Sequence, residues 1–221
     1  MADNSARSVV LERIRKATGG ASSLEAARAE WEELPRSYRR DASLEHDKLL
    51  ELLVERLRDY DAQVLRVGPS GVADAVKTML QARGVRRLVV PAGLPAGVLP
   101  EGFEFVVDAG FHPAELDTFD GVVTRSTVAI AETGTVVLQN TAGQGRRAAT
   151  LVPDYHLCVL YAADVVETVP QGMDRLEATA ALATTFVSGP SATADIEMTR
   201  IKGVHGPRFL DVVLVEGGEA N

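Results

Sequence analysis

Over the first 60 residues, apolar side chains recur at the spacing of amphipathic helices. Residues 5–16 and 43–60 show this spacing most clearly. A further helix is expected to follow Ser22. Its hydroxyl and the carboxylate of Glu25, three residues later, form a capping-box pattern. We therefore predict that residues 1–60 form a helical N-terminal extension.

From residue 61 onward, short runs of apolar and β-branched residues alternate with helical segments. The predicted strands are residues 64–67, 87–90, 103–107, 122–123, 128–131, 135–138, 157–161, 184–187 and 209–215. Predicted helices at residues 71–82 and 172–182 separate some of them. Repeated strand–helix–strand units form mostly parallel sheets with helices on both faces. The sequence thus predicts one α/β domain over residues 61–221.

Residues 128–138 break that alternation and predict a β-hairpin. Its tip is Glu132-Thr133-Gly134. In a cleft, Glu132 could act as a base, as a nucleophile or as a partner for a ligand hydroxyl. The alternative is a turn carboxylate that binds nearby backbone amides.

A second polar stretch, residues 188–207, lies between the last two predicted strands. Its serine, threonine and acidic residues predict a helix that starts near Ser191 and ends near Gly203. Ligands of open α/β sheets bind at the carboxyl ends of strands, where side-chain hydroxyls and helix amides converge. The alternative is that these side chains only cap the helix.

The adjacent Arg146 and Arg147 follow a glycine-containing loop and can pair with a carboxylate or phosphate, although loop arginines can also be simply solvated. The candidate catalytic residues are Glu132, Asp195 and His205. The candidate substrate-binding residues are Thr133, Gly134, Arg146, Gly189, Ser191, Thr193 and Gly206.

The composition and the charge of the chain argue against several classes of function. A net charge of −8 argues against a general nucleic-acid binder, because phosphate neutralisation needs clustered lysine and arginine. The start of the chain does not resemble a signal peptide, and no apolar run reaches the ~18 residues of a membrane span. We expect a cytoplasmic protein with no membrane span.

The chain offers little for a cofactor. Cys158 is the only cysteine, so the sequence contains no thiolate cluster for iron–sulfur or structural zinc. The four histidines lack metal-ligand spacing, and neither a GxGxxG nor a Walker-type loop occurs. We expect no metal site and no cofactor in this chain.

Three motifs carry a family resemblance. They are AIAETGTVVL at residues 129–138, RR followed by LVPDYH within residues 146–156, and GPSATADIE with GVHGP within residues 189–207. Together they resemble the LUD domain of the lactate utilisation protein C family, over roughly residues 64–215. The resemblance implies an α/β fold similar to the group of sugar-phosphate isomerases and CoA transferases.

The resemblance also implies a role in oxidising L-lactate to pyruvate together with two partner proteins, at least one of which carries iron–sulfur clusters. Since this chain contains no electron-carrying group, we expect a non-redox component that binds a small carboxylate or a partner subunit. In that role Arg146 neutralises the carboxylate, and His205 or Asp195 meets the hydroxyl.

Two alternatives stay open at this stage. One is an independent transferase or ligase-type enzyme of the CoA-transferase-like fold that acts on a small anionic metabolite, with Glu132 as the acyl-accepting carboxylate. The other is a pure assembly subunit, whose leucine-faced helix at residues 43–60 docks a partner. The sequence does not decide whether the chain is catalytic by itself.

Overall fold

The computed structural model describes residues 3–19, 23–190, 192–193, 201–203 and 205–217. The chain divides into two compact units, Met1–Tyr38 and Arg39–Asn221. The first unit contains α1 (Asp3–Ala17) and α2 (Leu24–Glu33). Ser23 caps α2 by accepting a hydrogen bond from the amide of Ala26 at 3.1 Å, one residue later than the predicted cap.

The third predicted helix, α3 (His46–Asp59), belongs to the second unit. Its apolar face is buried in the core of that unit, through Leu50, Leu53, Val54 and Leu57. Burial of a leucine-sized side chain contributes about 1.5–3 kcal/mol, so this face stabilises the α/β unit substantially.

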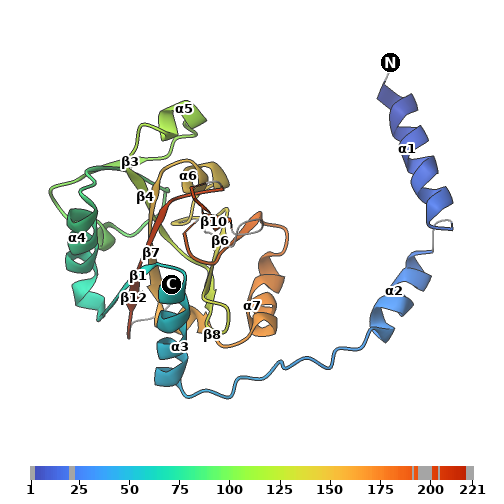
Figure 1. Ribbon diagram of the computed structural model, residues 1–221, viewed down its shortest axis with the longest axis horizontal. Helices are drawn as coiled ribbons and strands as arrows, with labels where there is room; N and C mark the ends of the chain where they lie inside the picture. Colours follow the sequence, from blue (N-terminus) through green and yellow to red (C-terminus); the bar gives the residue numbers. More distant parts are fainter. Residues whose placement is uncertain (1–2, 20–22, 191, 194–200, 204, 218–221) are drawn as a thin grey trace. The chain divides into compact units, whose positions relative to one another are not determined.

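A six-stranded parallel sheet forms the centre of the second unit (Figure 1), which confirms the predicted α/β class. In spatial order its strands are β1 (Gln63–Val67), β12 (Phe209–Val215), β7 (Tyr155–Tyr161), β4 (Gly121–Arg125), β2 (Arg87–Val90) and β3 (Glu104–Val107). The central strands β12, β7 and β4 read as nearly continuous apolar runs, as expected for strands covered on both faces.

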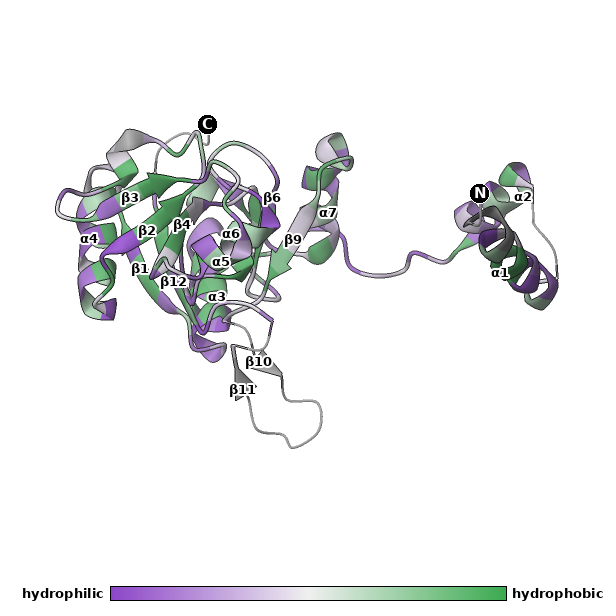
Figure 2. Ribbon diagram, turned by 90° about the horizontal axis from the view of Figure 1, so that it is seen from above, coloured by the Kyte–Doolittle hydropathy of each residue, from purple (hydrophilic) through white to green (hydrophobic). Residues whose placement is uncertain are grey.

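Each face of this sheet has its own apolar layer. α4 (Val72–Arg83) covers one face and packs on side chains such as Val213 and Leu157. α3 and a second sheet cover the other face, where Val212 and Cys158 are buried. In Figure 2 the strands are predominantly hydrophobic, whereas the helices are hydrophobic on one side only.

The second sheet has the strand order β8 (Val165–Val166), β5 (Val128–Ile130), β6 (Thr135–Gln139) and β9 (Thr184–Val187). β5 and β6 are antiparallel and form the predicted hairpin. α7 (Val169–Leu176) packs on its outer face. α7 starts earlier than predicted because Thr168 and Gln171 form a capping box, and it gives way to a 3₁₀ turn after Leu176.

Short elements complete the fold. They are α5 (Pro113–Leu116), α6 (Arg147–Leu151) and the 3₁₀ turns η1 (Pro69–Gly71), η2 (Ala96–Val98), η3 (Ala162–Asp164) and η4 (Glu177–Thr179). α5 and α6 contact each other beside the sheet.

The helix predicted between Ser191 and Gly203 is wrong where the structure describes this stretch. β10 (Ala192–Thr193) pairs antiparallel with β11 (Ile201–Lys202). Thr193 lies opposite Ile201, and two β-branched residues suit a strand pair better than a helix. Hydroxyl-bearing residues are as common in turns as at helix starts, so the capping pattern did not discriminate.

Candidate functional site

A cavity of about 230 Å³ brings several of the predicted residues together. We call it the amino-edge cavity, because it forms where β7 and β12 begin and β9 ends. Its polar lining residues are Arg147, Thr150, His156, Ser188 and His205, and its apolar lining includes Val187, Pro190, Pro207 and Leu210. The cavity thus lies at the amino edge of the parallel sheet. From the sequence we expected a ligand site at the carboxyl edge.

The predicted residues in the amino-edge cavity are Gly189, His205 and Gly206. Gly189 has a φ of +83°, and a Cβ added there would lie 2.3 Å from the Cβ of Tyr60 at the end of α3. A side chain at position 189 is therefore excluded by both conformation and space. Gly189 holds the cavity wall against α3.

Arg147 is the cationic residue of the amino-edge cavity. Its Nη1 donates to the hydroxyl of Thr150 at 3.3 Å, and its Nη2 donates to the carbonyl oxygen of His205 at 3.4 Å. Within the part of the chain that the structure describes, Arg147 forms no ion pair. An anion in the cavity could therefore pair with Arg147 without displacing a carboxylate of the described residues.

The predicted Arg146 lies elsewhere. It donates to both carboxylate oxygens of Asp108, at 2.7 and 3.0 Å, and to the carbonyl oxygen of Phe111 at 2.5 Å. Burial tends to raise the pKa of Asp108, but the hydrogen bond from Arg146 and those from backbone amides outweigh it, so the pKa is lowered. Arg146 lines a separate cavity of about 400 Å³ and is already neutralised there.

His156 contributes a buried imidazole to the amino-edge cavity. It is 2% exposed, and its Nε2 lies 2.7 Å from the hydroxyl oxygen of Thr124 on β4. Burial and the nearby charge of Arg147 lower the pKa of His156 to about 4. The imidazole is therefore neutral at physiological pH.

Sequence reasoning named Arg147 with Arg146 as a possible anion partner but placed only Arg146 among the site residues, and it did not select His156. The signal that could have found them is the RR and LVPDYH motif, which contains both. The fold brings them together because α6 and the start of β7 lie beside each other in the chain.

The tip of the β5–β6 hairpin is connected to the cavity by hydroxyl groups. The hydroxyl oxygen of Thr135 lies 2.7 Å from that of Thr133 and 2.7 Å from that of Ser188. Gly134 packs on α3, since a Cβ there would lie 2.8 Å from the Cβ of Arg56. Thr133 thus reaches the cavity wall through one intermediate residue.

Glu132 does not line the amino-edge cavity. Its side chain is 49% exposed and forms a salt bridge with Arg39 at 3.4 Å. Ser191 and Asp195 lie outside the described residues, and of Thr193 only the backbone position in β10 is described. The structure therefore leaves the predicted roles of Asp195 and Ser191 as predictions.

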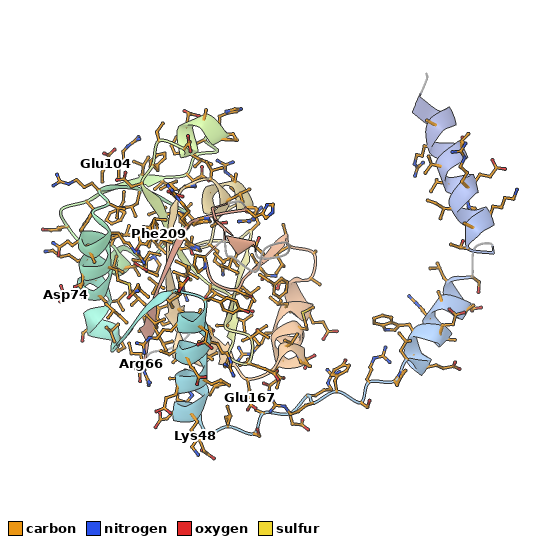
Figure 3. The ribbon with its side chains drawn as sticks, viewed as in Figure 1. Lys48, Arg66, Asp74, Glu104, Glu167 and Phe209 are labelled. Atoms are coloured by element: carbon orange, nitrogen blue, oxygen red, sulfur yellow. The ribbon has the colours of Figure 1, made fainter. Side chains whose placement is uncertain are left out.

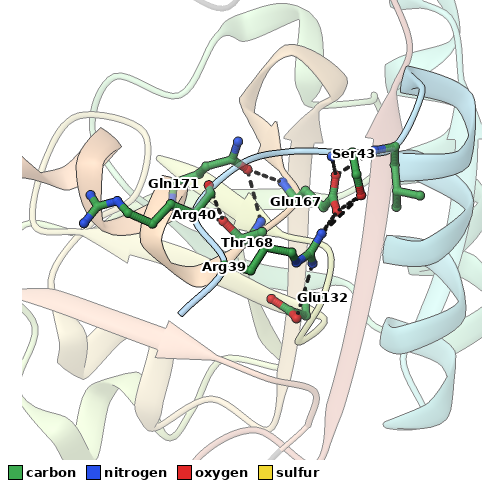
Figure 4. A network of polar contacts seen from close by, with 8 residues as sticks. Arg39, Arg40, Ser43, Glu132, Glu167, Thr168 and Gln171 are labelled. Carbon is green, nitrogen blue, oxygen red and sulfur yellow. Dashed lines mark hydrogen bonds and ion pairs between the residues drawn. The ribbon is translucent and has the colours of Figure 1, made fainter. Parts of the chain in front are cut away.

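Arg39 also binds Glu167, the centre of a polar network (Figure 4). The carboxylate of Glu167 is buried and accepts hydrogen bonds from the amides of Ser43 and Leu44, at 2.6 and 2.8 Å. Burial alone raises the pKa of this group, but the two amides, Arg39 and the Ser43 hydroxyl together lower the pKa to about 2. Figure 3 shows Glu167 beside the segment that leads into α3.

The described residues contain no group of three or more histidine, cysteine and acidic side chains placed to hold a metal ion. Among those residues, no helix is long and apolar enough to cross a membrane.

Similarity to known proteins shows the family of this chain. The LUD domain model matches residues 113–215. Lactate utilization protein C of Deinococcus radiodurans is 41% identical over 177 residues, which cover 79% of this chain and 82% of the relative. This chain belongs to the lactate utilization protein C family.

A relative and a solved structure add to this similarity. Lactate utilization protein C of Geobacillus thermodenitrificans is 27% identical, over 95% of both chains. A crystal structure of a DUF162 family protein from Deinococcus radiodurans is similar with a TM-score of 0.69 at 37% identity, and covers 78% of this chain and 99% of that chain.

The LUD match of this lactate utilization protein C family member contains every polar residue named in the amino-edge cavity, from Arg147 to His205. It also contains the β5–β6 hairpin and its hydroxyl connection to Ser188. α3, which supports Gly134 and Gly189, precedes the match. Residues that precede the LUD match thus pack against the residues within it.

Proposed function

We propose that this chain is a non-redox component of an iron–sulfur-dependent system that oxidises L-lactate to pyruvate, and that it binds a small carboxylate in the amino-edge cavity. Relatives are named lactate utilization protein C, which supports the pathway. With Cys158 as its single cysteine, the chain cannot supply the thiolates of an iron–sulfur cluster, so the electrons of lactate pass to other proteins.

One observation carries the choice of cavity. Arg147 faces the amino-edge cavity without an ion-pair partner among the described residues, whereas Arg146 next to it is bound by Asp108. A guanidinium group presents several donors in one plane and matches the two oxygens of a carboxylate. Arg147 therefore takes the carboxylate role that the sequence suggested for Arg146.

The rest of the cavity suits a small 2-hydroxy or 2-oxo acid. The side chains of Ser188 and His205 provide hydrogen-bonding groups for the substituent on the second carbon. Val187, Pro190 and Leu210 provide an apolar wall for a methyl group. A volume of about 230 Å³ excludes large ligands and admits a three-carbon acid.

Calorimetric titration of the full chain with L-lactate and pyruvate tests the binding half of the proposal. Replacing Arg147→Met should weaken binding about tenfold or more, because a hydrogen bond to a charged group contributes about 1.5–3 kcal/mol. Lys77→Met, an exposed position on α4, is the matched control for the loss of one positive charge. Equal affinity of the two variants, or no heat at millimolar ligand with partners absent and present, would contradict the proposal.

The partner half rests on the family name and on the missing redox group, and it places the chain in the cytoplasm with iron–sulfur proteins. A pull-down of the tagged chain from native lysate, followed by metal analysis of the eluate, should recover iron in stoichiometric amounts. An eluate without iron under conditions that preserve clusters would contradict this half alone.

A further inference from the structure

Beside the cavity that Arg146 lines, and sharing Gly93, Thr141 and Ala142 with it, a further cavity of about 400 Å³ lies at the carboxyl edge of the parallel sheet. We call it the carboxyl-edge cavity. Arg125 ends β4 and is followed by Ser126, while Asp164 lies in the turn after β7. β4 and β7 are parallel neighbours, so these residues reach the same edge. The carboxyl ends of parallel strands are the usual ligand-binding edge of α/β sheets.

Ser126 carries an unpaired hydroxyl at this cavity. The residue is 6% exposed, and its Oγ has no hydrogen-bond partner among the described residues. The thiol of Cys158 interacts with this hydroxyl, but a thiol is a weak hydrogen-bonding group and satisfies it poorly. A buried hydroxyl without a good partner costs about 1–3 kcal/mol, and a ligand that bonded to it would recover that free energy.

Arg125 shows the same deficit. Its Nε is buried and lacks a hydrogen-bond partner within the described part of the chain. Its guanidinium carbon lies 4.7 Å from the ring centre of Tyr161, a cation–π contact that orients the group. Arg125 and Ser126 are adjacent in the chain, and both line the carboxyl-edge cavity.

Asp164 completes the set, and this residue is 9% exposed. Among the described residues it forms neither a hydrogen bond nor a salt bridge. Burial raises the pKa of Asp164, while the positive charges of Arg125 and Arg175 oppose that shift. A carboxyl group in this setting can accept a hydrogen bond from a ligand hydroxyl.

The loop at residues 140–145 forms a wall of the cavity and is held by backbone contacts. The amide of Gly143 donates to the carbonyl oxygen of Ala92 at 2.8 Å, and the amide of Arg125 donates to the carbonyl oxygen of Gly143 at 2.7 Å. Gly93 has a φ of +82°, and a Cβ there would lie 2.8 Å from the Cβ of Ala142. The wall is therefore built on fixed backbone and is not a loose flap.

We infer that the carboxyl-edge cavity is a second ligand site, distinct from the amino-edge cavity, for a small hydroxylated monocarboxylate. The carboxylate accepts hydrogen bonds from Arg125 Nε and the Ser126 hydroxyl, and the ligand hydroxyl donates to Asp164. One cation beside one carboxyl group suits a singly charged anion. Inorganic phosphate, which is largely doubly charged near neutral pH, would be repelled by Asp164.

The Arg125 Nε–H group gives a direct test by ¹H–¹⁵N NMR of the full chain, with the signal assigned by its loss in Arg125→Lys. L-lactate should shift this signal saturably, acetate should do so with lower affinity because it lacks the hydroxyl, and inorganic phosphate should not bind. A signal that no probe moves at tens of millimolar, or one that phosphate moves more readily than L-lactate, would overturn the inference.

Two variants separate binding from folding. Ser126→Ala should weaken L-lactate binding at this signal about fivefold to tenfold, yet be at least as stable as the parent without ligand, since it removes an unpaired hydroxyl. Asp164→Ala should abolish the preference for L-lactate over acetate, because it removes the acceptor for the ligand hydroxyl. Unchanged affinities in both variants would contradict the assignment.

The same titration in the Arg147→Met background keeps this site separate from the proposed function. The Arg125 signal should respond as in the parent chain, even if the amino-edge cavity binds nothing. Loss of the response in Arg147→Met would place the only binding event at the amino edge and would overturn the second site.

Discussion

The Nε2 atom of His156 lies 2.7 Å from the hydroxyl oxygen of Thr124, and both side chains are buried between two parallel strands. His156 lines the amino-edge cavity, while Thr124 directly precedes Arg125 and Ser126 of the carboxyl-edge cavity. Besides the backbone pairing of these strands, one side-chain hydrogen bond thus joins a residue of the amino-edge cavity to the residue that precedes the carboxyl-edge cavity.

Replacing Thr124→Val should leave the buried His156 nitrogen without a partner and lower the free energy of unfolding by about 1–3 kcal/mol. Thr124→Ser keeps the hydroxyl and loses one methyl group, which costs about 1 kcal/mol. Urea unfolding followed by circular dichroism measures both. If Thr124→Ser proves as unstable as Thr124→Val, methyl packing and not the hydrogen bond is what matters at this position.

His156 should also make folding sensitive to pH in a defined window. Its pKa falls from an ordinary 6.5 to about 4 in the folded protein, so the unfolded chain binds the proton more readily. The contribution of the neutral His156 to the free energy of unfolding is complete above about pH 6.5. It is lost as the pH falls toward 4, because the unfolded chain takes up the proton first. Thermal unfolding of the parent and of His156→Gln across this range should show a flatter pH dependence in the variant. Parallel curves would contradict the shifted pKa.

Gly189 should tolerate alanine far less well than another glycine with positive φ. Gly84 ends α4 with a φ of +68° and open space around it, so Gly84→Ala incurs the backbone strain alone, about 1 kcal/mol. Gly189→Ala adds a clash with Tyr60, which overpacking data put at roughly 1–3 kcal/mol more. Comparable unfolding midpoints for the two variants would mean that the Tyr60 contact relaxes easily.

The strands and the hairpin were predictable because their signals are local. The apolar runs at residues 87–90 and 209–215 and the turn at Glu132-Thr133-Gly134 each specify an element without help from the rest of the chain. The parallel order, in which the last strand β12 lies between β1 and β7, depends on long-range pairing and could not be read from the pattern.

The candidate site was predicted less completely, for physical reasons. The sequence identified the glycines and His205 around the amino-edge cavity, because turn residues are visible in a motif. It could not distinguish Arg146 from Arg147, since only the fold brings Asp108 to the first of them. Nor could it reveal that the Nε of Arg125 and the hydroxyl of Ser126 lack hydrogen-bond partners among the described residues, because an unsatisfied group is defined by its surroundings.

Experiments on Glu132 distinguish the proposed carboxylate-binding role from the alternative of an acyl-transfer enzyme. Because this carboxylate pairs with Arg39 and lies outside the amino-edge cavity, Glu132→Gln should leave L-lactate affinity within about twofold of the parent. Incubation with an acyl-CoA and hydroxylamine, followed by mass spectrometry, should find residue 132 unmodified. A hydroxamate at Glu132 would instead favour the transferase alternative.

Glu167 should act as the anchor of the segment that precedes α3. Its carboxylate binds Arg39 and two backbone amides, so Glu167→Gln should lower Tm by roughly 5–10 °C at neutral pH and expose Arg39 and Arg40 to trypsin. Glu177→Gln removes the same charge from an exposed position and should change neither Tm nor cleavage appreciably.

The pH dependence of Tm provides a second test of the role of Glu167. The pKa of Glu167 is lowered from 4.5 to about 2, so its contribution is complete above pH 4.5 and is lost as the pH falls toward 2. The Tm difference between the parent and Glu167→Gln should therefore be largest at neutral pH and shrink below pH 4.5. A difference that stays constant through the acid range would show that the carboxylate is held by shape and not by its charge.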